Sequence, residues 1–241
     1  MEYSKTVVER LFDRAVTYRK ELLLSAALIA VSSASIAGYF AYKNYVACLG
    51  HKAYASALQL LQARVLKDNE TPGAFETVFT SSAAKWKAVA EAFGNVYVDY
   101  SHVGVGVIAG AAKVQALLRL GQDDEARVLL ADVLTHITSP ELRALYTLTY
   151  ARLLIDSESA ADQKSGVSLL AQLAATKDSA VNDSALYYLG LHYWLNHDAS
   201  SAANYWKQLV MQYEGVDKKS SPWVGKAKEK LALIQGAPES V

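Results

Sequence analysis

The chain has 241 residues, 52% of them hydrophobic, so it can form one domain of ordinary size with a real core. Its 24 basic and 24 acidic side chains cancel, which removes any general electrostatic attraction to nucleic acid or anionic substrates. The single cysteine, Cys48, excludes an internal disulfide framework and a cysteine-based zinc site. Few prolines and many helix-forming residues predict an all-α protein.

Residues 1–21 are predicted to form a tail ahead of an apolar run. Within it, residues 4–20 place apolar side chains at helical spacing with charges between them, which is typical of a short amphipathic helix at a membrane surface. The alternative is a solvated tail that becomes helical only near the apolar run.

Residues 22–42, LLLSAALIAVSSASIAGYFAY, carry no charged side chain. As a helix rising about 1.5 Å per residue they would span about 31 Å, close to the roughly 30 Å hydrocarbon core of a bilayer. The serines lower the hydropathy, but their hydroxyls can bond back to helix carbonyls and are tolerated in lipid. The run therefore predicts a single transmembrane helix, with a buried helix of a soluble domain as the alternative.

Basic residues flank the predicted span unequally. Five precede it, whereas only Lys43 and Lys52 occur in the twenty residues after Tyr42. By the positive-inside rule the N-terminus is cytoplasmic and residues 43–241 are exported. A cleaved signal peptide, or a lipoprotein that uses Cys48, is the rival interpretation. The apolar run is longer than a typical signal core, however, and the charged segment before it contains acids as well as bases.

Four small residues recur every four positions along the predicted span: Ala26, Ala30, Ala34 and Gly38. A stripe with so little side-chain bulk would let a second membrane helix approach closely, so these are candidate helix-packing positions. The alternative is that small residues are simply common in membrane helices and nothing docks there.

Residues 43–102 are predicted to be linking helices. An apolar stripe of helical period runs from Lys43 to Lys67 and stops at the polar turn of residues 68–73. A second helix is expected from about Phe75 to Phe93, followed by an extended connection over residues 94–100. The glycine-rich run 103–110 lacks the strand and the Gly-Lys-Ser/Thr of a nucleotide loop, and suits a closely packed helix better.

Residues 103–241 are predicted to be a degenerate tetratricopeptide-like array. Three helical hairpins, residues 104–137, 140–176 and 181–214, can be laid over one another. In the third, seven residues fall at the positions typical of a 34-residue repeat: Leu186, Leu189, Gly190, Tyr193, Ala202, Trp206 and Leu209. The segment from Ser221 to Gln235 is the expected capping helix. Together with the span, the pattern predicts a membrane-anchored α-solenoid.

Aromatic residues concentrate in the third hairpin. Tyr193 and Trp206 occupy core positions of the repeat, so they are expected to pack inside it. Tyr187, Tyr188 and Trp194 are freer and are the candidate protein-binding residues, because exposed amphipathic aromatics are enriched at interfaces.

We identify no catalytic or metal-binding motif in the sequence. The five histidines are scattered, and His192 and His197 are five residues apart, which does not place two ligands on one helical face. The acidic run 123–125 is explained by capping and the helix dipole. We therefore expect no enzyme, no cofactor, no metal and no small-molecule substrate.

The anchor, the segment from Ala90 to Val133 and the later hairpins together resemble the YfgM-type family of bacterial inner-membrane proteins. The resemblance implies a single-pass protein with a periplasmic repeat domain and a cytoplasmic N-terminus. It further implies an ancillary subunit of the Sec translocon, whose partners would be translocon components, periplasmic chaperones or exported polypeptides. A processed periplasmic or outer-membrane assembly factor with helical repeats is the alternative.

Overall fold

A computed structural model of the chain describes residues 18–67, 70, 73, 76–176, 179–215 and 221–236. Within these ranges the chain forms nine helices, α2 to α10, and one pair of two-residue strands. The chain divides into two compact units, Met1–Lys52 and Ala53–Val241. The amphipathic helix predicted for residues 4–20 lies outside the described residues except at its last positions.

Helix α2, Arg19–Gln62, contains the predicted span of residues 22–42. From Leu23 onward it is long and apolar enough to cross a membrane, and its most apolar stretch is not buried inside the protein. Ser35 Oγ donates to the carbonyl of Val31 at 2.8 Å, which is the back-bonding that admits serine to an apolar helix. The helix is therefore a candidate membrane span.

The helix predicted to reach Lys67 ends earlier, at Gln62. Arg64–Val65 then form β1, which pairs in parallel with β2, Val78–Phe79. The Arg64 guanidinium donates to the carboxylates of both Glu70 and Glu76 and so ties this connection together. The predicted helix end is wrong because these strand and side-chain bonds take the backbone out of the helix.

Helix α3, Ser82–Tyr100, starts later than predicted and is capped by Ser81, whose hydroxyl accepts an amide N–H of the first turn. It continues through residues 94–100, where an extended connection is predicted. That prediction is wrong because Val96 and Tyr97 extend the buried face begun by earlier residues of the helix. A lone strand would leave this apolar surface in water.

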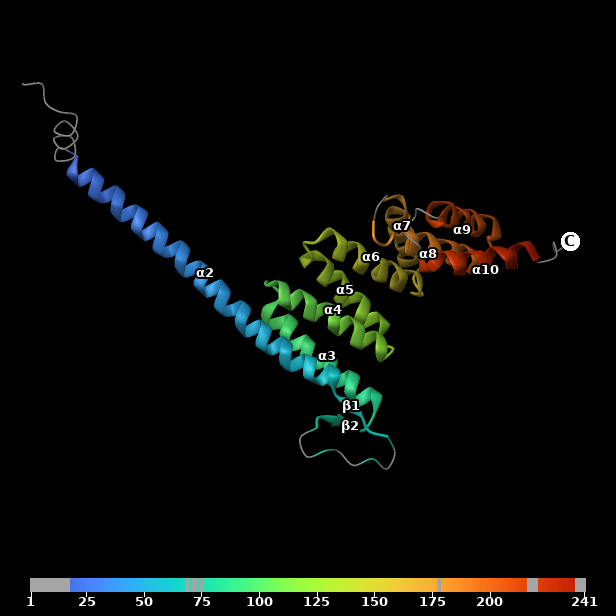
Figure 1. The fold of residues 1–241 in the computed structure, drawn as a ribbon, viewed down its shortest axis with the longest axis horizontal. Coiled ribbons are helices and arrows are strands. Elements are labelled where there is room, and N and C mark those ends of the chain that lie inside the picture. Colours follow the sequence, from blue (N-terminus) through green and yellow to red (C-terminus); the bar gives the residue numbers. More distant parts are fainter. Residues whose placement is uncertain are drawn as a thin grey trace, which may run out of the picture. The chain divides into compact units, whose positions relative to one another are not determined.

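The three predicted hairpins form with nearly the predicted boundaries, and Figure 1 shows each helix running beside the next. The glycine-rich run 103–110 begins a helix, as predicted. The hairpins are α4 with α5 (Gly104–Arg119, Asp123–His136), α6 with α7 (Pro140–Ile155, Ala160–Ala175) and α8 with α9 (Asn182–Leu195, Ala199–Tyr213).

Close approach within the hairpins depends on small residues. A β-carbon on Gly166 of α7 would lie 2.6 Å from the carbonyl oxygen of Ala151 on α6. A β-carbon on Gly190 of α8 would lie 2.3 Å from the indole nitrogen of Trp206 on α9. The repeat pattern places small residues at these positions for this reason.

A polar residue joins the second and third hairpins. Asn182, buried at the start of α8, donates its amide to the carbonyl of Ala174 at 2.5 Å and to those of Leu173 and Thr176 at the end of α7. Its amide oxygen accepts the hydroxyl of Tyr213 on α9. One side chain therefore satisfies carbonyls that the helix end leaves without intrahelical partners.

Helix α10, Pro222–Gly236, packs against α9 and α8 as the predicted cap. Ser221 fixes its start, since the hydroxyl donates to the Asp183 carboxylate at 2.6 Å and accepts the amide N–H of Trp223. Ala227 is its fully buried residue.

The apolar core of the unit Ala53–Val241 has two main parts. One lies among the end of α2, α3, α4 and α5, and the other among α6 to α10. Helix α6 contacts both, because Tyr146, Tyr150 and Leu153 pack against the first part while Leu148 and Ala151 belong to the second.

Candidate interaction surface

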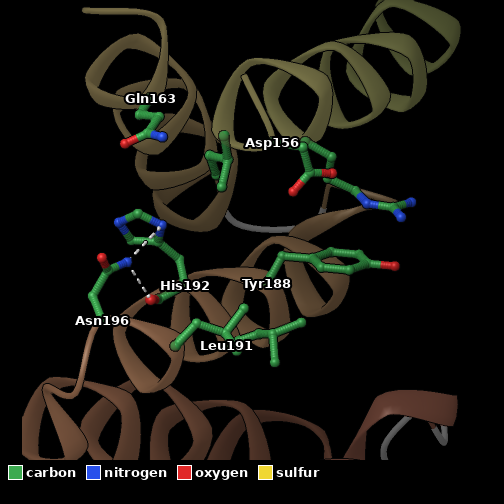
Figure 2. Close-up of a pocket in the computed structure, with 9 residues that line it drawn as sticks. Asp156, Gln163, Tyr188, Leu191, His192 and Asn196 are labelled. Atoms are coloured by element: carbon green, nitrogen blue, oxygen red, sulfur yellow. Dashed lines mark hydrogen bonds between the residues drawn. The ribbon is translucent and has the colours of Figure 1, made fainter. Parts of the chain in front are cut away.

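An open groove of about 290 Å³ lies between α6 and α8, with one wall completed by α7. Figure 2 shows Asp156 and Gln163 facing Tyr188, Leu191 and His192 across it. The lining residues are Arg152, Ile155, Asp156, Gln163, Tyr188, Leu191, His192, Leu195 and Asn196.

The groove has an apolar floor. Ile155 comes from the last turn of α6, and Leu191 and Leu195 lie one turn apart on α8. Leu195 keeps 69% of its surface exposed. The floor therefore offers apolar surface that nothing in the described chain covers.

One end of the groove is polar. Asn196, the C-cap of α8, donates its side-chain amide to the carbonyl of His192 at 2.8 Å. Burial lowers the pKa of the His192 imidazole, which favours the neutral form of the ring. Gln163 donates to the carbonyl of Ser157 at 2.8 Å, which leaves its amide oxygen as an acceptor.

The other end carries a ladder of stacked side chains. The guanidinium carbon of Arg152 lies 4.3 Å from the centre of the Tyr188 ring, and Trp223 meets that ring edge-on at 5.2 Å. The Lys226 ammonium lies 4.5 Å from the Trp223 ring. The ladder thus connects α6, α8 and α10 through two aromatic rings that lie between two cationic groups.

The three candidate aromatic residues differ in how accessible they are to solvent. Tyr187 is 8% exposed and packs against Trp223, with ring centres 4.6 Å apart, so the expectation that it is freely accessible is wrong. Trp194 is half-buried and lies 6.2 Å from the fully buried Trp206. Tyr188 alone lines the groove, and its role in protein binding stays a prediction.

The two predicted core aromatics differ. Trp206 is fully buried and its indole N–H donates to the carbonyl of Tyr187 at 3.1 Å, which confirms the core position. Tyr193 is only half-buried and stacks on Tyr205 with ring centres 5.5 Å apart. Burial is the largest cause that raises the pKa of Tyr205.

The small residues of the predicted span, Ala26, Ala30, Ala34 and Gly38, all lie on the exposed surface of α2. Among the described residues, beyond the neighbouring backbone of α2 itself, no group lies within 4 Å of a β-carbon placed on Gly38. Their role in helix packing stays a prediction. In the part of the chain that the structure describes, no three His, Cys, Asp or Glu side chains gather to hold a metal ion.

Sequence reasoning missed most of the groove. Arg152, Ile155 and Asp156 had no distinguishing motif, and Leu191 and Leu195 looked like ordinary helix residues. The repeat register could have found them, because the first helices of successive hairpins lie side by side and expose equivalent positions on one face.

No family model matches the chain, and no curated protein matches it. Among solved structures, a crystal structure described as nearly identical TPR-like repeats of a kinesin light chain from Podosopora anserina is similar, with a TM-score of 0.50 and 17% identity. The match covers 63% of this chain and 77% of that chain. The fold is a tetratricopeptide-like array. The comparison and the helix order confirm the predicted fold class.

Proposed function

We propose that this protein is a non-catalytic, membrane-anchored scaffold that binds other proteins on the periplasmic face of a bacterial inner membrane. The observation that carries the proposal is the groove between α6 and α8, whose apolar floor is open in a tetratricopeptide-like array. Arrays of this kind use extended surfaces made by successive repeats to bind partners.

The size of the groove suits protein side chains. At about 290 Å³ it lies just below the range of about 300–1,000 Å³ for small-molecule sites, and it is partly open to solvent. Its apolar floor and mixed polar ends would take one or two apolar side chains of a partner, with polar groups at either side.

The anchor would raise the local concentration of the array at the membrane, so that a modest intrinsic affinity is enough. The excess of basic residues before the span supports a cytoplasmic N-terminus and an exported array. The resemblance to YfgM-type proteins supports translocon components and periplasmic chaperones as partners, and exported polypeptides as clients. The stripe from Ala26 to Gly38 would then pack against a membrane helix of the translocon.

Photocrosslinking in cells tests the groove. A photoreactive residue at Leu195, in the groove, is compared with one at Val128 on α5, since both side chains are 69% exposed. We expect a discrete crosslinked protein from position 195 and none of the same mass from position 128. Identical products from both positions, or no product from position 195, would contradict the proposal.

Cys48 provides a topology test, because it is the only cysteine and is exposed on α2. A membrane-impermeant maleimide should label it in spheroplasts without permeabilisation. Labelling only after permeabilisation would place the array in the cytoplasm. Mass spectrometry of the mature N-terminus tests the alternative of a processed assembly factor, which would begin near Cys48.

A further inference from the structure

The groove lies where two helices end. Helix α6 ends at Ile155 and α8 ends at Leu195, and residues from the last turns of both line the groove. The aligned peptide dipoles give the carboxyl end of each helix a partial negative charge of about half an elementary charge. Helix α7 begins beside the groove, but an acidic side chain, Asp162, lies in its first turn and offsets the positive charge of that end. Two negative helix ends therefore face the groove.

Asp156 adds a full negative charge to these helix ends. It is the C-cap of α6, a position where a carboxylate is unfavourable because it adds to the negative end of the helix. Figure 2 shows its side chain facing Tyr188 across the groove. Arg152 lies one turn earlier, but its guanidinium stacks on the Tyr188 ring. Among the described residues, no cationic nitrogen lies within 4 Å of the Asp156 carboxylate.

The amide side chains of the groove offer hydrogen-bond acceptors. Gln163 uses its N–H group on the carbonyl of Ser157 at 2.8 Å, and Asn196 uses its own on the carbonyl of His192 at 2.8 Å. The side-chain oxygens of both residues remain as acceptors. Burial favours the form of the His192 ring without a positive charge. The groove therefore combines an apolar floor with a carboxylate and amide oxygens.

We propose that this groove takes a basic side chain, lysine or arginine, from a partner polypeptide. The aliphatic stem lies on Ile155 and Leu191, and the charged head binds the carboxylate of Asp156. Lysine and arginine suit such a place because they bury an apolar stem while their heads, which carry only donors, stay among polar groups. An acidic side chain would meet the negative helix ends, and an apolar one would leave Asp156 unpaired.

This inference rests on the proposed function and names the chemistry of the bound side chain. The full chain in detergent is immobilised and used to select from a phage-displayed library of random short peptides, after removal of phage that bind detergent alone. We expect lysine or arginine next to apolar residues in the enriched peptides. Enrichment of acidic peptides, enrichment without basic residues, or no enrichment would overturn the inference.

A double-mutant cycle assigns the basic residue to Asp156. An enriched peptide is synthesised with its basic residue and with norleucine in that place, which keeps an aliphatic stem and removes the charge. Titration calorimetry should show that norleucine weakens binding to the natural chain about tenfold. Asp156→Asn should weaken binding of the basic peptide by a similar factor and should bind both peptides equally. If norleucine weakens binding to both chains by the same factor, or to neither, the pairing is refuted.

Glu91→Gln is the matched control, because it removes one negative charge at an exposed position of α3 outside the groove. It should bind both peptides as the natural chain does. A loss equal to that in Asp156→Asn would show a general effect of net charge and would overturn the inference. Circular dichroism should be the same in all three chains, and the norleucine comparison on the natural chain needs no variant.

The two proposals fail differently. If position 195 crosslinks a protein in cells but the selected peptides carry no basic residue, the groove binds proteins through another side chain and this inference alone is wrong. If position 195 crosslinks nothing while the cycle couples the basic residue to Asp156, the cellular role is wrong and this inference stands.

Discussion

Replacing Gly190 by alanine should destabilise the third hairpin severely for so small a change. The added methyl carbon would lie 2.3, 2.6 and 2.7 Å from three atoms of the Trp206 indole, about 1 Å inside an ordinary contact. Trp206 is fully buried and its N–H donates to the carbonyl of Tyr187, so the ring cannot move without losing that bond.

The magnitude follows from three contributions. Overpacking costs about 1–3 kcal/mol, an unpaired buried N–H costs about 1–3 kcal/mol, and the better helix propensity of alanine returns about 1 kcal/mol. We expect Gly190→Ala to lower the free energy of unfolding by about 3 kcal/mol, measured by urea denaturation of the full chain in detergent with far-ultraviolet circular dichroism.

Gly225→Ala in α10 is the matched control. In the described part of the chain, no group outside the local backbone of α10 lies within 4 Å of a β-carbon there, so the variant should be as stable as the natural chain or more stable by up to about 1 kcal/mol. If Gly190→Ala unfolds at the same urea concentration as Gly225→Ala, the packing argument is refuted.

Three further predictions concern other contacts. Asn182→Ala should lower the free energy of unfolding by about 1–3 kcal/mol, because it leaves buried carbonyls at the end of α7 unpaired. A double-mutant cycle of Arg127→Met and Asp162→Asn should give a coupling of about 0.5–3 kcal/mol, since their partly buried ion pair joins α5 to α7. Burial and a hydrogen bond raise the pKa of Tyr97 above its usual 10, so stability should fall as pH rises above that value, and less steeply in Tyr97→Phe.

Each of these has its own check by urea denaturation. Asn204→Ala, at an exposed position of α9, should leave stability unchanged, and an equal loss in both asparagine variants would contradict the capping role. If the free-energy changes of Arg127→Met and Asp162→Asn add up to the change in the double variant, the ion pair contributes nothing to stability. The free energy of unfolding of Tyr97→Phe should still fall somewhat as pH rises, because burial also raises the pKa of Tyr146 and Tyr187. If it falls as steeply as in the natural chain, Tyr97 does not contribute to the pH dependence.

The hairpins could be predicted because each depends on a few local features. Small residues such as Gly190 and Ala202 occur at fixed spacing from large ones such as Trp206, and turns such as that at Gly121 separate the helices. Gly121 adopts a φ of 72°, which glycine enters without strain. These are properties of a single hairpin and are visible in one sequence.

The connection between α2 and α3 was predicted less well because its structure depends on distant partners. Arg64 leaves the helix to bond with Glu70 and Glu76, and β1 pairs with β2 across the intervening loop. The alternation near Tyr97 was misleading for a similar reason, since the buried face of α3 is set by packing against α4.

The candidate site was predicted only in part because accessibility is decided between hairpins. Tyr187 and Tyr188 are adjacent in the sequence, yet one is buried against Trp223 and the other lines the groove. Which of them faces solvent depends on where α10 packs, and the hairpin pattern of α8 and α9 carries no information about that.

The position of α6 between two parts of the core has a mechanical consequence. Force applied across the array would pass from α7–α10 to α2–α5 through the apolar contacts of α6 and through the ion pair of Arg127 with Asp162. A substitution that loosens the packing of α6 should therefore weaken the mechanical link between the two parts of the core.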